Sequence, residues 1–199
     1  IHEIAAAAGV KNVPAGILNL EVKIGGRLET ADALVKLNVK ELKAPGVPKS
    51  FPPATIDVMS TLKANRLVVD AKVVQAPLNP LTLKADVPVE VVKLTKQPAT
   101  AMGLPLKATL DLPETDLSFA REFAPQLVRA SPAKLKVHVN VGGTVKAPLI
   151  ESVIDLNAPE IEFVSADMPS VHNLRVKVHS HDRKVTVEDI SVVLAGGHV

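Results

Sequence analysis

Histidine and carboxylate side chains gather near the end of the chain, where His179, His181 and Asp182 follow one another closely. Residues two apart on a β-strand share a face, so these residues have the types and spacing of a zinc site, with His172 or His198 as a further ligand. The same stretch is also typical of a polar hairpin turn. We favour the turn, so the prediction is that the chain has no metal site and no cofactor.

Patterns for catalysis are weak throughout the sequence. Ser180, His181 and Asp182 have the residue types of a hydrolase triad, but adjacent strand residues alternate faces and do not form that relay. The glycine pairs at 25–26 and 142–143 lack the lysine of a phosphate-binding loop. We therefore predict a protein that is not an enzyme. The carboxylates lie singly on alternating segments and show no convergent pair: Asp57, Asp70, Asp86, Asp111 and Glu151.

The composition limits the kind of partner. Hydrophobic residues make up 47% of the chain, and nearly all of them are Val, Leu, Ile and Ala. The chain has four Phe and no Tyr or Trp. Protein-binding hot spots favour Trp, Tyr and Arg, whereas flexible hydrocarbon needs only contact area. The net charge is +2 and the basic residues are spread along the chain, so nucleic acid is not an expected partner. The chain has no cysteine, which excludes disulfides.

Short alternating runs, punctuated by sixteen prolines and ten glycines, fill the chain and predict many strands. Alternate residues of a strand share a face, and one apolar face opposite one polar face is typical of antiparallel sheet. We therefore predict an all-β, antiparallel fold with one aliphatic face. The expected members of that face are Leu18, Leu20, Val22, Ile24, Val35, Leu37, Val39, Ile56, Val58, Leu67, Val69, Leu81, Leu83, Leu106, Leu110, Leu135, Val137, Val139, Val141, Ile154, Leu156, Leu174, Val176, Val185 and Val187.

One short helix is expected near 116–127. It would open near Thr115 or Asp116 and end near Pro125. Because two of the four Phe lie on it, we expect it either to cap the end of a sheet or to connect elements packed on the core. Residues at roughly helical spacing are Leu117, Phe119, Phe123 and Leu127.

The chain repeats itself at an offset of 117 residues, which aligns Gly25–Gly26 with Gly142–Gly143. Leu18–Ile24 then falls on Leu135–Val141, and the match continues with a one-residue slip as far as Val69 on Val187. The sequence therefore predicts one β unit at 1–131, which includes the short helix, and the start of a second, truncated unit at 132–199. On this scheme Ile1–Gly9 is the helical tail of a preceding unit.

The stretch from Leu135 to Val199 resembles the AsmA/TamB superfamily of bacterial envelope proteins. The resemblance rests on an alternating strand, the turn Val141–Pro148, a second strand, a hairpin through Leu174 to Val192 and a terminal Gly196-Gly197-His198-Val199. The segment Pro105–Leu112, followed by Asp116-Leu117, resembles the part that precedes such a unit in that family. Coverage is essentially the whole chain.

The resemblance implies an elongated, U-shaped sheet (a β-taco) whose hydrophobic groove carries phospholipid or another acyl-chain lipid between the inner and outer membranes. It also implies a periplasmic location, an inner-membrane anchor outside this segment and an outer-membrane β-barrel as partner. Two alternatives stay open on the residues alone. One is a structural or adhesive array of β-sandwich domains, and the other is a chaperone groove for outer-membrane proteins.

Overall fold

The structure is a computed structural model that describes residues 15–43, 47–48, 51–123, 125–126, 128–130, 132–165, 167–181 and 184–194. The expected helical tail at Ile1–Gly9 and the residues Leu127, Asp182 and His198 lie outside this part. The strands are β1 (Ala15–Gly25), β2 (Asp32–Lys43), β3 (Ala54–Lys63), β4 (Arg66–Val74), β5 (Leu81–Pro88), β6 (Lys107–Asp116), β7 (Val128–Ala130), β8 (Lys134–Gly143), β9 (Pro148–Phe163), β10 (Val171–His181) and β11 (Lys184–Leu194).

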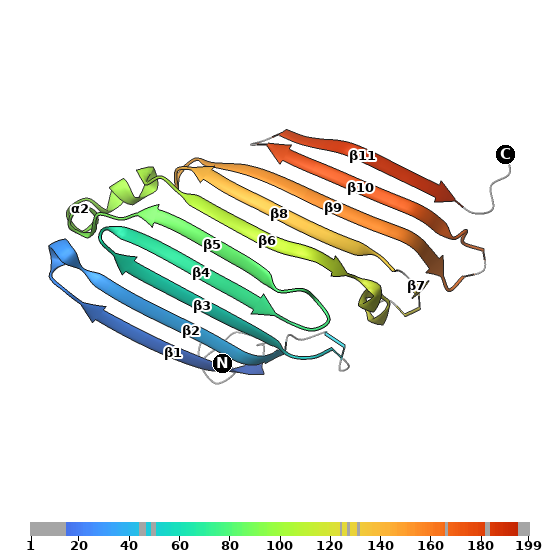
Figure 1. Ribbon diagram of the computed structural model, residues 1–199, viewed down its shortest axis with the longest axis horizontal. Coiled ribbons are helices and arrows are strands. Elements are labelled where there is room, and N and C mark those ends of the chain that lie inside the picture. Colours follow the sequence, from blue (N-terminus) through green and yellow to red (C-terminus); the bar gives the residue numbers. More distant parts are fainter. Residues whose placement is uncertain are drawn as a thin grey trace.

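These strands form one open antiparallel sheet, which confirms the predicted all-β fold class (Figure 1). The order is β1-β2-β3-β4-β5-β6-β8-β9-β10-β11, and the short β7 pairs with β9 off this path. Strands on the main path therefore follow one another in space almost as they do in sequence. Such a path is expected when short turns join strands that each bury one side, because antiparallel neighbours need only a tight connection.

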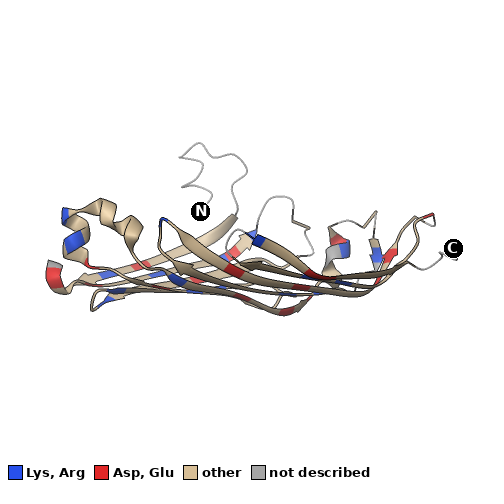
Figure 2. Cartoon of the chain, turned by 90° about the horizontal axis from the view of Figure 1, so that it is seen from above, with Lys and Arg blue, Asp and Glu red and all other residues tan. Residues whose placement is uncertain are grey.

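Seen from above, the sheet is a thin, gently bowed layer with the helical segments on one side of it (Figure 2). The α-helix α2 (Val91–Lys96) and the 3-10 helix η2 (Pro98–Gly103) stand at one end of the strands, near the 3-10 helix η1 (Leu28–Thr30). The 3-10 helix η3 (Ser118–Glu122) stands at the opposite end. Helical segments therefore lie at both ends of the strands, and the middle of the sheet lies between them.

The helix predicted near 116–127 is shorter than expected, and its expected first residues belong to a strand. Thr115 and Asp116 are the last residues of β6, where they pair with Leu135 and Lys134 of β8. Strand pairing wins there because the Thr115 side chain is fully buried, with its hydroxyl donating to the Pro113 carbonyl oxygen at 2.7 Å. The helix that follows is only the one-turn η3, opened by an Asp116 carboxylate that accepts from the Ser118 N–H at 2.7 Å.

The turn after β1 and the turn after β8 have the same geometry. Gly26 and Gly143 both have positive φ, 85° and 78°. The N–H of Thr30 donates to the Arg27 carbonyl at 2.9 Å, and 117 residues later the N–H of Ala147 donates to the Thr144 carbonyl at 3.1 Å. Strands β1 to β4 and β8 to β11 likewise coincide when the two copies are aligned. The division into units at 131/132 stays a prediction. Strands β6 and β8 pair across this point within one continuous sheet.

Candidate functional site: the aliphatic face

Strand register brings aliphatic side chains from all parts of the chain onto one side of the sheet. Residues directly paired in an antiparallel sheet point to the same face, so each ladder of pairs is a row of side chains. We use the name aliphatic face for the side of the sheet that carries these rows. Its central row is Leu20, Leu37, Val58, Ala71, Leu83, Leu110, Val139, Ser152, Ser180 and Val185. The rows beside it contain Leu18, Val39, Ile56 and Val73 on one side and Val22, Val35, Ser60 and Val69 on the other.

All the residues predicted for this face lie on it except Leu106, which does not belong to a strand. Leu106 lies directly before β6, and its N–H donates to the Gly143 carbonyl at 3.0 Å. Sequence reasoning missed Leu62, Ile150 and Ile190, which the register adds to the same side. Alternation could have found Ile150, two residues before Ser152 and four before Ile154. Whether these residues bind lipid stays a prediction.

Much of the aliphatic face is open to solvent. Leu20 and Ile24 on β1 are 61% and 80% exposed, and Val185 on β11 is 67% exposed. Among the strands that the structure describes, no second sheet covers this side. Large contiguous apolar surface is costly to leave in water and marks a binding site in soluble proteins. The face therefore has the character of an apolar binding surface.

Three phenylalanines form a cluster at one end of the strands. The Phe51 ring centroid lies 5.1 Å from that of Phe119 and 5.4 Å from that of Phe123, in tilted and edge-on arrangements favourable to aromatic pairs. Phe51 is only 6% exposed, and the small residues Ala54, at the start of β3, and Ala133, directly before β8, are buried. The aromatic cluster is thus a packed rim, and the open aliphatic surface begins beyond it.

Two hydroxyl groups interrupt the central aliphatic row. Ser152 on β9 and Ser180 on β10 are directly paired, and their Oγ atoms lie 2.8 Å apart. Each hydroxyl thereby satisfies part of the other's hydrogen-bonding capacity, so the pair is compatible with an apolar neighbourhood. Neither serine was expected on this face from the sequence.

The opposite side of the sheet carries charges of alternating sign. Glu21 lies between Lys23 and Lys36, with oxygen to nitrogen distances of 2.6 Å and 3.4 Å, and these hydrogen bonds lower the pKa of its carboxyl. Arg66 donates from Nε to both Asp86 oxygens at 2.8 Å and 3.0 Å, which lowers the pKa of Asp86. Cross-strand pairs of this kind are typical of a solvated face and discourage stacking of a second sheet.

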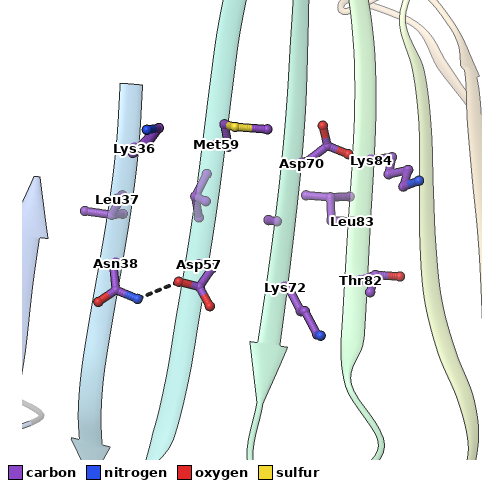
Figure 3. Close-up of a pocket in the computed structure, with 12 residues that line it drawn as sticks. Lys36, Leu37, Asn38, Asp57, Met59, Asp70, Lys72, Thr82, Leu83 and Lys84 are labelled. Atoms are coloured by element: carbon purple, nitrogen blue, oxygen red, sulfur yellow. Dashed lines mark hydrogen bonds between the residues drawn. The ribbon is translucent and has the colours of Figure 1, made fainter. Parts of the chain in front are cut away.

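A hollow of about 400 Å³ lies on strands β2 to β5 (Figure 3). Within it the carboxylates do not converge, because Asp57 is directly opposite Lys72 and Asp70 is directly opposite Lys84. Two carboxylates that each face a lysine lack the arrangement of a general acid and base pair. The lining residues are Lys36, Leu37, Asn38, Asp57, Val58, Met59, Asp70, Ala71, Lys72, Thr82, Leu83 and Lys84.

The histidines that suggested zinc bind separate carboxylates. His179 Nδ1 lies 3.1 Å from Glu188 Oε1, and His181 Nδ1 lies 2.9 Å from Glu151 Oε1. His172 Nδ1 lies 3.6 Å from Glu160 Oε1, on a third pair of residues. Within the described ranges no group of three histidine or carboxylate side chains is placed to hold a metal ion. The structure therefore distributes these residues along β10 instead of gathering them.

Fold and site together define an open, single-layer antiparallel β-sheet protein with one aliphatic and one charged face. Comparison of the chain with protein families, with curated proteins and with solved structures finds no match. In the part of the chain that the structure describes, no helix has the length and apolarity required to cross a bilayer.

Proposed function

We propose that the aliphatic face binds the acyl chains of phospholipid or a similar lipid and passes them along the sheet without chemical change. The observation that carries this proposal is the continuous row from Leu20 to Val185, which crosses the sheet from β1 to β11 with no covering layer of described strands. The resemblance of the sequence to the AsmA/TamB superfamily supports the same function, in the space between the inner and outer membranes of a bacterial envelope.

The energetics favour a hydrocarbon occupant. Burying one Val or Leu side chain is worth about 1.5–3 kcal/mol relative to leaving it exposed. Hydrocarbon chains provide that burial along the whole row and require no hydrogen-bonding partner from the wall. Neighbouring strands lie roughly 4.8 Å apart, so ten strands make a path of roughly 43 Å, longer than the roughly 15 Å contributed by the acyl chains of one leaflet. A lipid can therefore move along the path while staying in contact with it.

The two alternative functions differ in what covers the face. In a β-sandwich array a second sheet would seal the same rows, and the single layer formed by the described strands favours the groove instead. A chaperone groove would hold an unfolded outer-membrane protein on the same surface. The poverty in aromatic side chains, with four Phe and no Tyr or Trp, favours lipid over peptide because peptide-binding anchors are rich in rings.

The test is lipid capture by matched variants. Native mass spectrometry of the purified chain should detect co-purified phospholipid, and a phospholipid with a fluorescent acyl chain should bind to it. Leu110→Asp puts a charge on the aliphatic face, opposite Leu83 and Val139, and should weaken probe binding about tenfold or more. Thr109→Asp is the control on the adjacent residue, whose side chain lies on the charged face opposite Lys84.

Equal binding by the two variants would refute the proposal, as would a folded chain that neither retains lipid nor binds the probe. To separate lipid from unfolded protein as cargo, a photocrosslinker at Val137 should label phospholipid in preference to a peptide derived from an outer-membrane strand. Preferential labelling of the peptide would favour the chaperone alternative.

A further inference from the structure

The repeated architecture points to a strand position beside β1 that none of the described strands fills. Strand β8 aligns with β1 in the other copy of the unit, and it has a neighbour on each side, β6 and β9. Strand β1 stands first in the sheet order, with only β2 beside it among the described strands. In the described part of the chain, no strand takes beside β1 the position that β6 takes beside β8.

Burial of the aligned residues supports this comparison. Leu20 and Ile24 of β1 are 61% and 80% exposed, whereas their counterparts Val137 and Val141 in β8 are half-buried. The difference corresponds to the apolar surface that β6 covers on β8. An edge strand with exposed aliphatic side chains and free backbone groups is a template for strand addition.

We propose that the edge of β1 between Leu18 and Ile24 binds an antiparallel β-strand of alternating aliphatic and polar residues, as β8 binds β6. The β6–β8 register defines the expected pairing. Leu112 lies opposite Val137, Leu110 opposite Val139 and Ala108 opposite Val141. The added strand therefore places aliphatic residues opposite Leu20, Val22 and Ile24 and extends the aliphatic face by one row.

Charge refines the chemistry of this partner strand. In the β6–β8 pair Asp111 faces His138, and the counterpart of His138 on β1 is Glu21. A strand with a carboxylate at that point would place like charges opposite each other, which is unfavourable. Glu21 is already paired with Lys23 and Lys36, so the partner strand expected at β1 has no carboxylate opposite Glu21 and carries a neutral or basic residue there. This inference does not depend on the proposed lipid function, because strand pairing can be measured without lipid.

Disulfide trapping tests the register, and the chain suits it because it has no cysteine of its own. The probe is a synthetic peptide with the sequence of residues 105–117 that carries Asp111→Lys and a cysteine in place of Leu110. Oxidised glutathione is the oxidant, and the protein carries Val22→Cys. Directly opposed residues have Cβ atoms about 4.5–5.5 Å apart, close to disulfide range, whereas residues shifted by two positions are about 7–8 Å apart.

The matched pair, position 110 with position 22, should crosslink at least about tenfold faster than the same protein with the peptide cysteine at 108 or 112. A second matched pair, peptide position 112 with Leu20→Cys, should behave in the same way. The peptide that keeps Asp111 should react more slowly. Val35→Cys, on the interior strand β2, measures random collision and should crosslink at background rate.

Crosslinking that is equally fast in all registers would overturn the proposal, as would rates at Val22→Cys and Leu20→Cys no higher than at Val35→Cys. Each cysteine variant is checked by circular dichroism for an unchanged β-sheet spectrum before reaction. Val22 is 51% exposed on an edge strand, so its substitution should leave the fold intact.

Discussion

Ser152 Oγ lies 2.8 Å from Ser180 Oγ in the central row of the aliphatic face, directly between Val139 and Val185. The two hydroxyls form a polar pair in a row that is otherwise aliphatic. Each serine keeps its place on this face because the other supplies a hydrogen-bonding partner.

Replacing only one of these serines should be less favourable than replacing both. Ser152→Val leaves the Ser180 hydroxyl without its partner and should cost about 1 kcal/mol of unfolding free energy. The double variant Ser152→Val with Ser180→Val removes both polar groups and adds two good strand formers, so it should be neutral or stabilising. Urea denaturation of the four proteins in the cycle measures the coupling, expected to be about 1 kcal/mol. Strictly additive effects would show that the pair does not matter.

The glycines with positive φ should tolerate no side chain. A Cβ on Gly143 would lie 2.6 Å from the Ala147 carbonyl oxygen, and one on Gly26 would lie 2.3 Å from the Thr30 carbonyl oxygen. Gly143→Ala and Gly26→Ala should each reduce stability by about 2 kcal/mol, measured by urea denaturation.

The neighbouring glycines are the matched controls, because a Cβ on Gly25 or Gly142 would meet nothing within 4 Å. Gly25→Ala and Gly142→Ala should change stability by less than about 0.5 kcal/mol. Equal effects at the members of each glycine pair would contradict the turn geometry.

The aromatic cluster should stabilise its end of the sheet through Phe51. Because Phe51 is 6% exposed and contacts two rings, Phe51→Ala should cost about 3 kcal/mol of unfolding free energy. Phe123 is 49% exposed, and Phe123→Ala should cost only about 1 kcal/mol. Thermal unfolding followed by circular dichroism compares the two. A larger loss for Phe123→Ala would place the centre of the cluster elsewhere.

The ion pair between Arg66 and Asp86 should make stability depend on acid. Hydrogen bonds from Arg66 hold the pKa of Asp86 below its ordinary value, so the pair stabilises the fold above that ordinary value. The contribution is lost as the pH falls through the lowered pKa. The melting temperature of the unaltered protein should therefore fall more between about pH 5 and about pH 2 than that of Asp86→Asn.

Arg66→Gln tests the same pair from its other side. Without the guanidinium the pKa of Asp86 should return toward its ordinary value, and the acid-dependent loss should shrink as it does in Asp86→Asn. An undiminished acid dependence in both variants would show that other carboxylates account for it.

A charge at Val139 should be tolerated if the aliphatic face is open. Val139→Asp leaves the carboxylate in contact with water and should cost about 1–2 kcal/mol, mainly through poorer strand propensity and lost apolar contact. Burial under a second sheet would instead raise the cost to several kcal/mol, because the charge would be unpaired. Urea denaturation distinguishes the two cases, with Val139→Thr as the uncharged control of similar shape. A loss above about 4 kcal/mol would contradict an open face.

Alternation by itself determined which residues share a face within a regular strand, because the period of a strand is two and does not depend on distant contacts. A register shift in the β10–β11 pair places Ile190 on the aliphatic face three residues after Val187, which alternation does not predict. The repeat at an offset of 117 residues likewise aligned Gly26 with Gly143, and both have positive φ in the turns that follow β1 and β8. Local chemistry gave only part of the answer where strand pairing over long distances intervened. Thr115 and Asp116 have the character of a helix start, and Asp116 does accept from the N–H of Ser118 in η3, but pairing with Leu135 and Lys134 keeps both residues in β6.

Only the tertiary structure decided how the apolar segments combine. The sequence does not encode in any local pattern whether two apolar stripes face each other in a sandwich or lie side by side in one layer, since both arrangements bury the same residue types. The unbroken order of strand pairing placed the apolar stripes side by side. It also brought Ser152 against Ser180, and it left β1 with a neighbour on one side only among the described strands. Register between strands, a long-range property, is the physical reason for all three.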